Sequence, residues 1–252
     1  MFTWLRDRRR KAILADPFPP EWEPWLERHL ACWPRLGEDQ RQRLRELVQV
    51  FVAEKRWEGC GGLAMTGEIR VAVAVQACLL VLELPHDLYQ RVESILVYPS
   101  TVVIPDRQGR GGVRTEGPMP ILGLAVSRGP VVLAWDAVRR GSQHPERTHN
   151  VVFHEFAHKL DMLDDSLDGT PPLADKEQYA RWVEVCTREY QALQAAAEEG
   201  RSSFLDHYGS TNVAEFFAVA TEAFFDEPTE LRRRHSELYG VLAGFYRQDP
   251  AG

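Results

Sequence analysis

The segment Val151–Asp161 constrains the fold of this chain more than any other, because it places two histidines within an apolar helix. It reads VVFHEFAHKLD, and apolar residues flank His154 and His158 on both sides. Residues four positions apart lie one turn apart on the same side of a helix, so the two imidazoles can point the same way. The alternative is an amphipathic helix with solvated or capped histidines, but burying two imidazoles without a partner is costly. The segment therefore predicts a buried helix whose two histidines share one ligand.

His154, Glu155 and His158 match the HExxH pattern, in which two histidines of one helix bind zinc. Glu155 lies beside them and, without binding the metal, can take a proton from a water molecule that the zinc activates. A closed structural zinc site is disfavoured, because such sites are rich in cysteine and the four cysteines of this chain include no CxxC pair. We therefore expect one catalytic Zn2+ ion per chain, with Glu155 as the base.

A third zinc ligand must come from outside the motif, since a catalytic zinc site usually takes three protein ligands. The extended form HExxHxxGxxH is absent, because Asp161 and Asp164 stand where Gly and His would. A glutamate on a later helix is the usual alternative, and Glu215 and Glu222 both qualify. Asn212 and Glu215 also have the spacing of a capping box, which would direct Glu215 to the start of its own helix. Spacing alone thus leaves Glu215, Glu222 or neither as the third ligand.

Composition indicates an ordinary soluble globular protein: 44% of the 252 residues are hydrophobic and 27% are charged, which excludes a disordered chain. The net charge of -7 presents a repulsive average field to nucleic acid, so we expect no direct nucleic-acid contact. A basic run at residues 6–11 is interpreted as a solvated segment, with a nucleic-acid or membrane contact as the alternative. Too few apolar residues follow it for a signal peptide, and no stretch is long enough to span a membrane. We therefore expect a cytoplasmic protein with reduced cysteines.

The hydrophobic periodicity predicts an α+β fold. Helices are expected at residues 21–33, 38–57, 67–82, 150–163, 176–199, 212–225 and 229–246, and strands at 94–104, 121–126 and 131–135. Residues 57–62, which hold three glycines, are expected to join two helices, and residues 107–120 to form an exposed loop. We place a domain boundary near residue 90, between an N-terminal helical region, 1–90, and a second domain, 91–252, with a small sheet.

Two segments together resemble the Mlc titration factor A family of bacterial zinc peptidases, and more distantly the catalytic domain of anthrax lethal factor. They are HEFAHKLDMLD, from His154, and YGSTNVAEFFAVATEAFF, from Tyr208. The likeness extends over most of the chain from about residue 57, through WEGCGG, VYPS and SRGPVVLAW. It implies a zincin-like metallopeptidase domain, in which a small mixed sheet accompanies the active-site helices.

The resemblance also implies roles for single residues. The glutamate of the AEFF segment completes the zinc site in that family, and here it is Glu215. A tyrosine at the place of Tyr208 stabilises the developing oxyanion in the lethal factor relatives; a plain turn aromatic is the alternative. Glu222 then becomes a packing or supporting group. Asp161, one turn beyond His158, is expected to orient an imidazole or to be a surface residue.

The function implied by the resemblance is hydrolysis of peptide substrates with aminopeptidase-like preference. The alternative is regulatory: a protein similar to this family binds the glucose-linked transcriptional repressor Mlc and lifts its repression, so this chain would sequester such a repressor. For the peptidase we expect an extended substrate to add to the strand at residues 121–126. The expected solvated histidines are His29, His86, His144 and His235, while His149 and His207 lie near the motif without ligand spacing.

Overall fold

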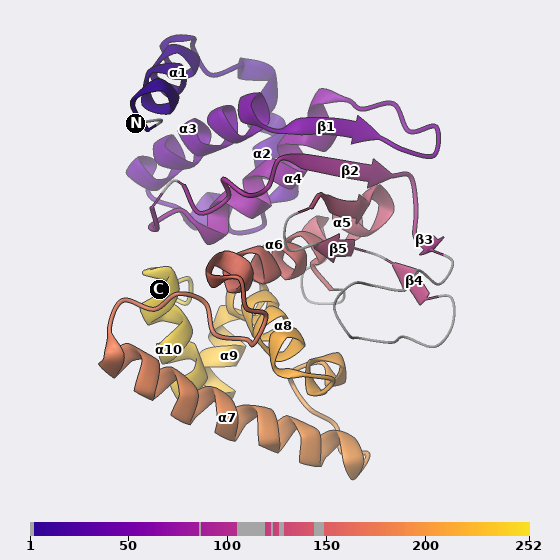
Figure 1. Ribbon diagram of the computed structural model, residues 1–252, viewed down its shortest axis with the longest axis vertical. Helices are drawn as coiled ribbons and strands as arrows, with labels where there is room; N and C mark the ends of the chain where they lie inside the picture. Colours follow the sequence, from indigo (N-terminus) through magenta and orange to yellow (C-terminus); the bar gives the residue numbers. More distant parts are fainter. Residues whose placement is uncertain (1–2, 86, 105–118, 122, 126–128, 144–148) are drawn as a thin grey trace.

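A computed structural model describes residues 3–85, 87–104, 119–121, 123–125, 129–143 and 149–252 of the protein. Figure 1 shows helix α6 near the centre, with the N-terminal helices and the strands on one side of it and the C-terminal helices on the other. The helices are α1 (Thr3–Ala15), α2 (Glu23–His29), α3 (Glu38–Glu54), α4 (Gly67–Leu80), α5 (Trp135–Gln143), α6 (Val151–Asp161), α7 (Lys176–Glu198), α8 (Val213–Asp226), α9 (Pro228–Arg234) and α10 (Ser236–Tyr246).

Within the described residues, four strands form a small mixed sheet in the order β1-β2-β6-β5. β1 and β6 both pair parallel to β2, whereas β5 pairs antiparallel to β6 at the edge. A separate antiparallel pair joins β3 and β4. The strands are β1 (Arg56–Gly59), β2 (Ser94–Tyr98), β3 (Val102–Ile104), β4 (Met119–Ile121), β5 (Gly123–Ala125) and β6 (Val131–Ala134). The predicted α+β class is therefore confirmed.

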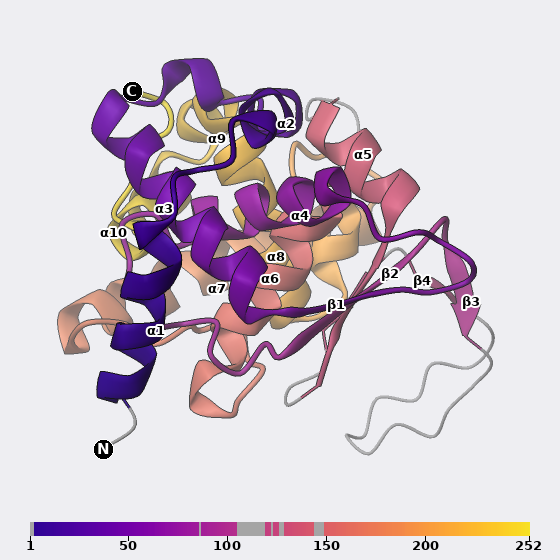
Figure 2. The ribbon, with the colours of Figure 1, turned by 90° about the horizontal axis from the view of Figure 1, so that it is seen from above.

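Helix α4 forms the centre of the N-terminal half. It begins at Gly67, and the preceding Thr66 caps it, because the Thr66 side chain accepts a hydrogen bond from the backbone amide of Ile69. Nearly every residue from Ile69 to Leu80 is buried, because α2, α3, α5 and α6 surround the helix. Figure 2 shows α4 lying across α6, with α3 alongside. The unbroken apolar run thus reflects burial on all sides.

Strand β1 corrects the predicted helix 38–57 and the predicted connection at 57–62. Helix α3 ends at Glu54, and the chain then extends along β2 in parallel register, with Arg56 opposite Ser94 and Gly59 opposite Val97. The four residues of this strand, RWEG, alternate between exposed and half-buried, but so short a segment does not by itself distinguish a strand from the end of a helix. Its pairing partner lies almost 40 positions later in the chain, so tertiary contacts decide its conformation.

Three further differences concern helices. The predicted helix 229–246 is two helices, α9 and α10, because the backbone of His235 leaves the helical region at φ -135° and ψ 57°. Helix α5 follows β6 directly and was not predicted. Helix α1 occupies the segment that the sequence presents as solvated. That interpretation is wrong for Arg10, whose Nε and Nη2 donate to the two Glu54 oxygens at 2.8 and 2.9 Å.

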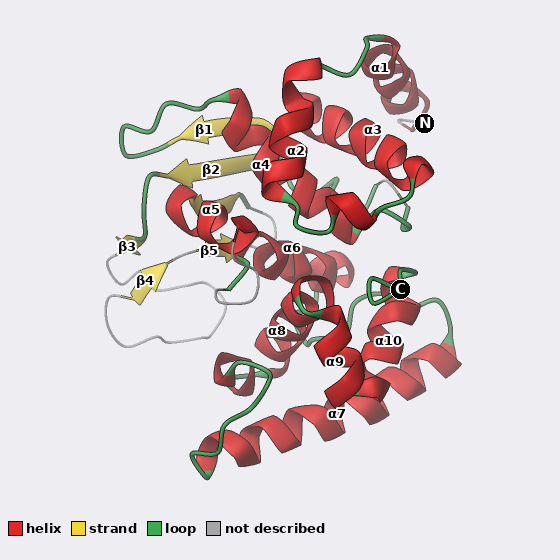
Figure 3. Ribbon diagram, turned by 180° about the vertical axis from the view of Figure 1, so that it is seen from behind, coloured by secondary structure: helices red, strands yellow, loops and turns green. Residues whose placement is uncertain are grey.

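The predicted boundary near residue 90 stays a prediction. Buried residues on both sides of it belong to one hydrophobic cluster, and β1, from the N-terminal side, pairs with β2. Figure 3 shows the same arrangement from behind, with α9 and α10 between α6 and the long helix α7. Most of the predicted loop 107–120 lies outside the described residues. In the described part of the chain, every helix is too short or too polar to cross a bilayer.

Candidate metal centre

Helix α6 carries its polar and apolar side chains on different sides. Asn150 caps the helix by accepting a hydrogen bond from the Phe153 amide at 3.1 Å. Phe156 is fully buried and packs against the rings of Phe51 and Tyr89, with centroid distances of 5.8 and 4.9 Å. The other side of α6 faces α8 and β5. The sequence prediction of a buried helix for the motif is confirmed.

The two motif histidines and Glu215 converge on one point. Nε2 of His154 lies 2.9 Å from Oε2 of Glu215 and 3.2 Å from Nε2 of His158. Nε2 of His158 lies 3.4 Å from the same Glu215 oxygen. In the described part of the chain, these three residues are the group whose potential metal-binding atoms all lie within 4.8 Å of one another. Two imidazole nitrogens and a carboxylate oxygen at this spacing fit a divalent cation.

Glu215 owes its position to the start of helix α8. Asn212 caps α8, and its Oδ1 accepts hydrogen bonds from the amides of Ala214 and Glu215, both at 3.0 Å. Because Asn212 serves these donors, the Glu215 side chain is turned toward the imidazoles. Burial raises the pKa of Glu215, but hydrogen bonds to His154 and His158 outweigh it and lower that pKa to about 2. Glu215 is therefore a carboxylate at every physiological pH.

Glu222 supports His154 from behind. Its Oε1 lies 2.7 Å from Nδ1 of His154, and its Oε2 accepts the Asn150 amide at 2.7 Å. Burial lowers the pKa of His154, but hydrogen bonds to Glu215 and Glu222 raise it overall to about 10. With Nδ1 held by Glu222, Nε2 is left to face the candidate metal position.

His149 is a residue that sequence reasoning left aside. Its Nδ1 lies 3.3 Å from Oε2 of Glu222, and its Nε2 lies 3.2 Å from Oδ2 of Asp206. Hydrogen bonds to Asp206 and then to Glu222 raise the pKa of His149 to about 10. The sequence around His149 does not predict these contacts, because Asp206 and Glu222 lie 57 and 73 positions further along the chain. Its place just before the motif helix was the one available signal.

Glu155 lies on the β5 side of α6. A methyl group added at Gly123 would lie 2.4 Å from a carboxylate oxygen of Glu155, so the strand backbone passes directly beside this side chain. Only glycine leaves that space. Burial raises the pKa of Glu155, although the neighbouring charges of His154 and His158 oppose the rise. A buried carboxylate with a raised pKa is suited to accept and return a proton.

Tyr208 lies beside His154, in the short 3-10 turn His207–Ser210. Its ring centroid is 5.9 Å from that of His154, and 43% of the residue is exposed. Burial of the hydroxyl and the negative charge of Glu215 raise the pKa of Tyr208 to about 12. The backbone amide of Tyr208 donates to Oδ1 of Asp206 at 2.7 Å.

Asp161 is fully buried at the end of α6. Its oxygens accept hydrogen bonds from the amides of Gly169 and Thr170, at 2.9 and 3.0 Å. Among the described residues, neither motif histidine forms a hydrogen bond with it. Nδ1 of His158 is buried and has no hydrogen-bond partner within the described part of the chain.

The remaining histidines differ from the sequence expectation in one respect. His29 is fully buried, and its ring nitrogens lie 2.9 Å from Ser142 Oγ and 3.2 Å from Glu68 Oε1, so the prediction of a solvated residue is wrong. His235 is half-buried, with Nδ1 2.8 Å from Glu189. His86 and His144 lie outside the described residues.

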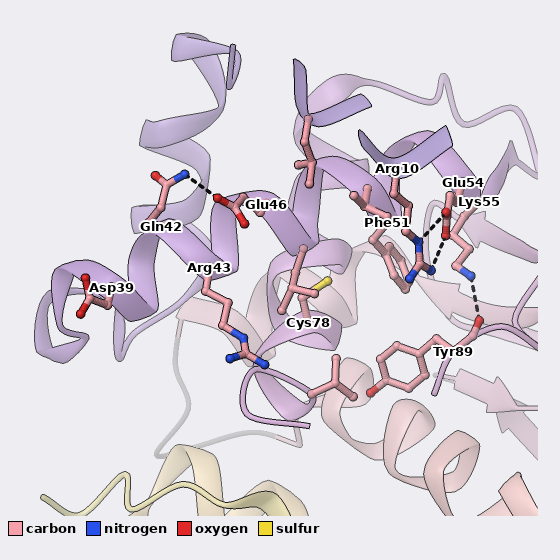
Figure 4. Close-up of a pocket in the computed structure, with 14 residues that line it drawn as sticks. Arg10, Asp39, Gln42, Arg43, Glu46, Phe51, Glu54, Lys55, Cys78 and Tyr89 are labelled. Atoms are coloured by element: carbon pink, nitrogen blue, oxygen red, sulfur yellow. Dashed lines mark hydrogen bonds and ion pairs between the residues drawn. The ribbon is translucent and has the colours of Figure 1, made fainter. Parts of the chain in front are cut away.

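A separate cavity of about 460 Å³ lies behind the motif helix, between α1, α3 and α4 (Figure 4). The Arg10–Glu54 pair lies at its rim, and Lys55 donates to the backbone oxygen of Tyr89 at 2.7 Å. Arg10 and Glu54 thus bind each other, whereas Arg43, also in the wall, lies 3.6 Å from Glu83 outside the cavity lining. Phe51 and Tyr89 form part of the wall and contact Phe156, so the cavity and the candidate metal centre lie on opposite sides of α6.

Comparison with known proteins places this arrangement in a family. A protein of Synechocystis sp. without assigned function is 38% identical over 98% of this chain and 90% of its own length. "Mlc titration factor A" of Edwardsiella ictaluri is 34% identical over 90% of this chain and 88% of its own, and that of Yersinia pestis is 32% identical over 99% and 90%. The model of the glucose-regulated metallo-peptidase M90 family matches residues 3–247. The chain belongs to the glucose-regulated metallo-peptidase M90 family.

Proposed function

We propose that this protein is a zinc-dependent peptidase with aminopeptidase-like preference, built on a zincin-like fold and acting in the cytoplasm. The observation that carries the proposal is the convergence of His154, His158 and Glu215 within 4.8 Å, next to Glu155 of the same helix α6. This donor set of two imidazoles and one carboxylate is that of catalytic zinc sites. When bound, zinc supplies a Lewis acid that activates water and polarises the peptide carbonyl.

Two side chains of the protein then act in the reaction: Glu155 transfers the proton of the water, and Tyr208 stabilises the negative charge on the carbonyl oxygen. Glu155, buried and with a raised pKa, takes the proton of the attacking water and returns it to the leaving amine. The hydroxyl of Tyr208 donates a hydrogen bond to the carbonyl oxygen as negative charge develops there. A pKa of about 12 keeps this hydroxyl protonated at neutral pH, so it can act as a donor.

The substrate is proposed to bind along β5. This strand is at the edge of the sheet among the described strands, and its Gly123 lies against Glu155. An extended peptide can add to such an edge as a further strand, which brings one of its carbonyl groups to the general base.

The direct test is Glu155→Gln, which keeps the size of the side chain and removes the base. We expect hydrolysis of aminoacyl p-nitroanilides to fall by about 10²- to 10⁴-fold while zinc stoichiometry stays at one per chain. Full activity of this variant would contradict the peptidase mechanism. The same assay with N-acetylated substrates tests the aminopeptidase-like preference, because the blocked amine should abolish turnover.

The second candidate function is sequestration of a glucose-linked transcriptional repressor of the Mlc type. The name "Mlc titration factor A" of relatives that match at least 85% of this chain favours it. A pull-down of such a repressor should succeed equally with Glu155→Gln and with zinc-free His158→Ala if binding is separate from catalysis. No capture by the wild-type protein at micromolar concentrations would count against this function.

A further inference from the structure

We propose that His149 is a positioning residue that couples the metal ligand His154 to the turn carrying Tyr208. The proposal rests on the proposed peptidase function and adds a residue that no motif assigns. It concerns two parts of the site that belong to different elements: His154 on α6, and Tyr208 on the turn before α8.

The first half of the connection runs through Glu222. This side chain is 9% exposed, and both of its oxygens have partners. Oε1 lies 2.7 Å from Nδ1 of His154, while Oε2 accepts a hydrogen bond from the backbone amide of Asn150 and lies 3.3 Å from Nδ1 of His149. Two consecutive residues before α6 thus hold the carboxylate that orients the ligand. A shift of Glu222 would rotate the His154 ring, and His149 opposes that shift.

The second half runs through Asp206. Oδ2 of Asp206 lies 3.2 Å from Nε2 of His149, and Oδ1 accepts the amide of Tyr208 at 2.7 Å. His149 therefore touches a carboxylate with each ring nitrogen, which requires both nitrogens to donate. The His149 ring therefore connects Glu222, which holds His154, to Asp206, which caps the turn that contains Tyr208.

The exposure of His149 and Asp206 indicates that these residues position other groups and contribute little to stability. The side chains of His149 and Asp206 are 44% and 49% exposed, so their contacts contribute little to the free energy of unfolding. Their removal should change the geometry of the reaction without unfolding the chain. Misplacement by an ångström far from the reacting atoms can slow catalysis about 100-fold.

The test compares His149→Ala and Asp206→Ala with His235→Ala. The control removes a similar histidine–carboxylate contact, 2.8 Å from Nδ1 to Glu189, in a partly buried setting at the junction of α9 and α10. We expect kcat to fall about 10- to 100-fold in both test variants, with KM within about twofold and Tm close to wild type. Zinc affinity should fall about tenfold in His149→Ala, stay unchanged in Asp206→Ala, and match wild type in the control.

A double substitution tests whether Asp206 acts on kcat through Tyr208. In a Tyr208→Phe background, Asp206→Ala should add less than about twofold to the loss of kcat, because the group it positions is already gone. Multiplicative losses would overturn the proposal, as would wild-type kcat and zinc affinity in His149→Ala. His149→Gln, which can keep one of the two contacts, should recover part of the rate. If wild-type protein binds zinc and Glu155→Gln is inactive, a failure here concerns the His149 coupling alone.

Discussion

The two sides of helix α6 differ in what they contact. On one side, His154 meets two glutamates and His158, each contact made by a polar atom. On the other, Phe156 meets only the rings of Phe51 and Tyr89 among its aromatic neighbours in the described residues. Glu155 and Phe156 are adjacent in sequence yet have different neighbours: Glu155 lies beside Gly123 of β5, and Phe156 beside the two rings. One short helix can therefore carry residues for metal binding and residues for core packing at neighbouring positions. Substitutions at neighbouring positions should then affect either zinc binding and hydrolysis or the free energy of unfolding.

The largest effect on stability is expected from Phe156→Ala. It opens a cavity among fully buried aromatic rings and should lower the free energy of unfolding by about 3–5 kcal/mol. Zinc stoichiometry should remain at one at temperatures where the variant is folded, because the ligands lie on the other side of α6. Urea unfolding together with metal analysis checks both statements. A variant as stable as wild type, or one that is folded and zinc-free, would break the comparison.

The second prediction concerns Asp161, the last residue of α6, and the pH dependence of stability. Burial raises the pKa of Asp161 to about 6, from an ordinary value near 4. The folded state then binds a proton more tightly than the unfolded state, so this group stabilises the fold below pH 4, and that contribution is lost as pH rises to 6. We expect the free energy of unfolding of wild type, measured relative to Asp161→Asn, to fall by about 2 kcal/mol across that window.

The same variant separates two roles for Asp161. Its oxygens bind the amides of Gly169 and Thr170, so Asp161→Asn should leave zinc affinity within about twofold of wild type. A tenfold loss of affinity would instead show that Asp161 orients an imidazole. Chelator competition at neutral pH measures the difference.

The smallest effect is expected at helix α1. Arg10→Ala removes a two-point ion pair with Glu54 whose side chains are 17% and 14% exposed, and should cost about 1 kcal/mol of unfolding free energy. Hydrolysis and zinc binding should not change, since Phe51, Tyr89 and Phe156 separate this helix from the metal ligands. Thermal unfolding in low and high salt provides the measurement, with the difference from wild type shrinking as salt screens the pair. A change in kcat would show that the two sides of α6 are coupled.

The motif helix could be predicted from sequence because the positions of His154 and His158 depend only on local helical geometry. Spacing alone could not identify Glu215 as the third ligand, since it also allowed Glu222, or a capping box in which Glu215 binds the start of its own helix. The structure brings both glutamates to His154, with Glu215 on the metal-facing nitrogen and Glu222 on the other. The predicted α+β class followed from periodicity alone.

What sequence could not supply depends on contacts between distant positions. His29 is buried, with its Nδ1 2.9 Å from Oγ of Ser142, 113 positions away, and no pattern around His29 indicates this contact. His149 was set aside for lack of ligand spacing, because its partners lie far along the chain. The four-residue strand β1 has the same cause, since β2 alone makes it extended. Local rules therefore predict the motif, whereas its supporting contacts required the folded structure.

The central claim is that His154, His158 and Glu215 hold a single zinc ion. The most direct measurement is zinc affinity by chelator competition for wild type, Glu215→Ala and Glu222→Ala. We predict one zinc per wild-type chain, a loss of affinity of more than about 100-fold for Glu215→Ala, and a loss of about 10- to 100-fold for Glu222→Ala, which only orients His154. Wild-type affinity in Glu215→Ala, or no zinc uptake by the wild-type protein, would contradict the account.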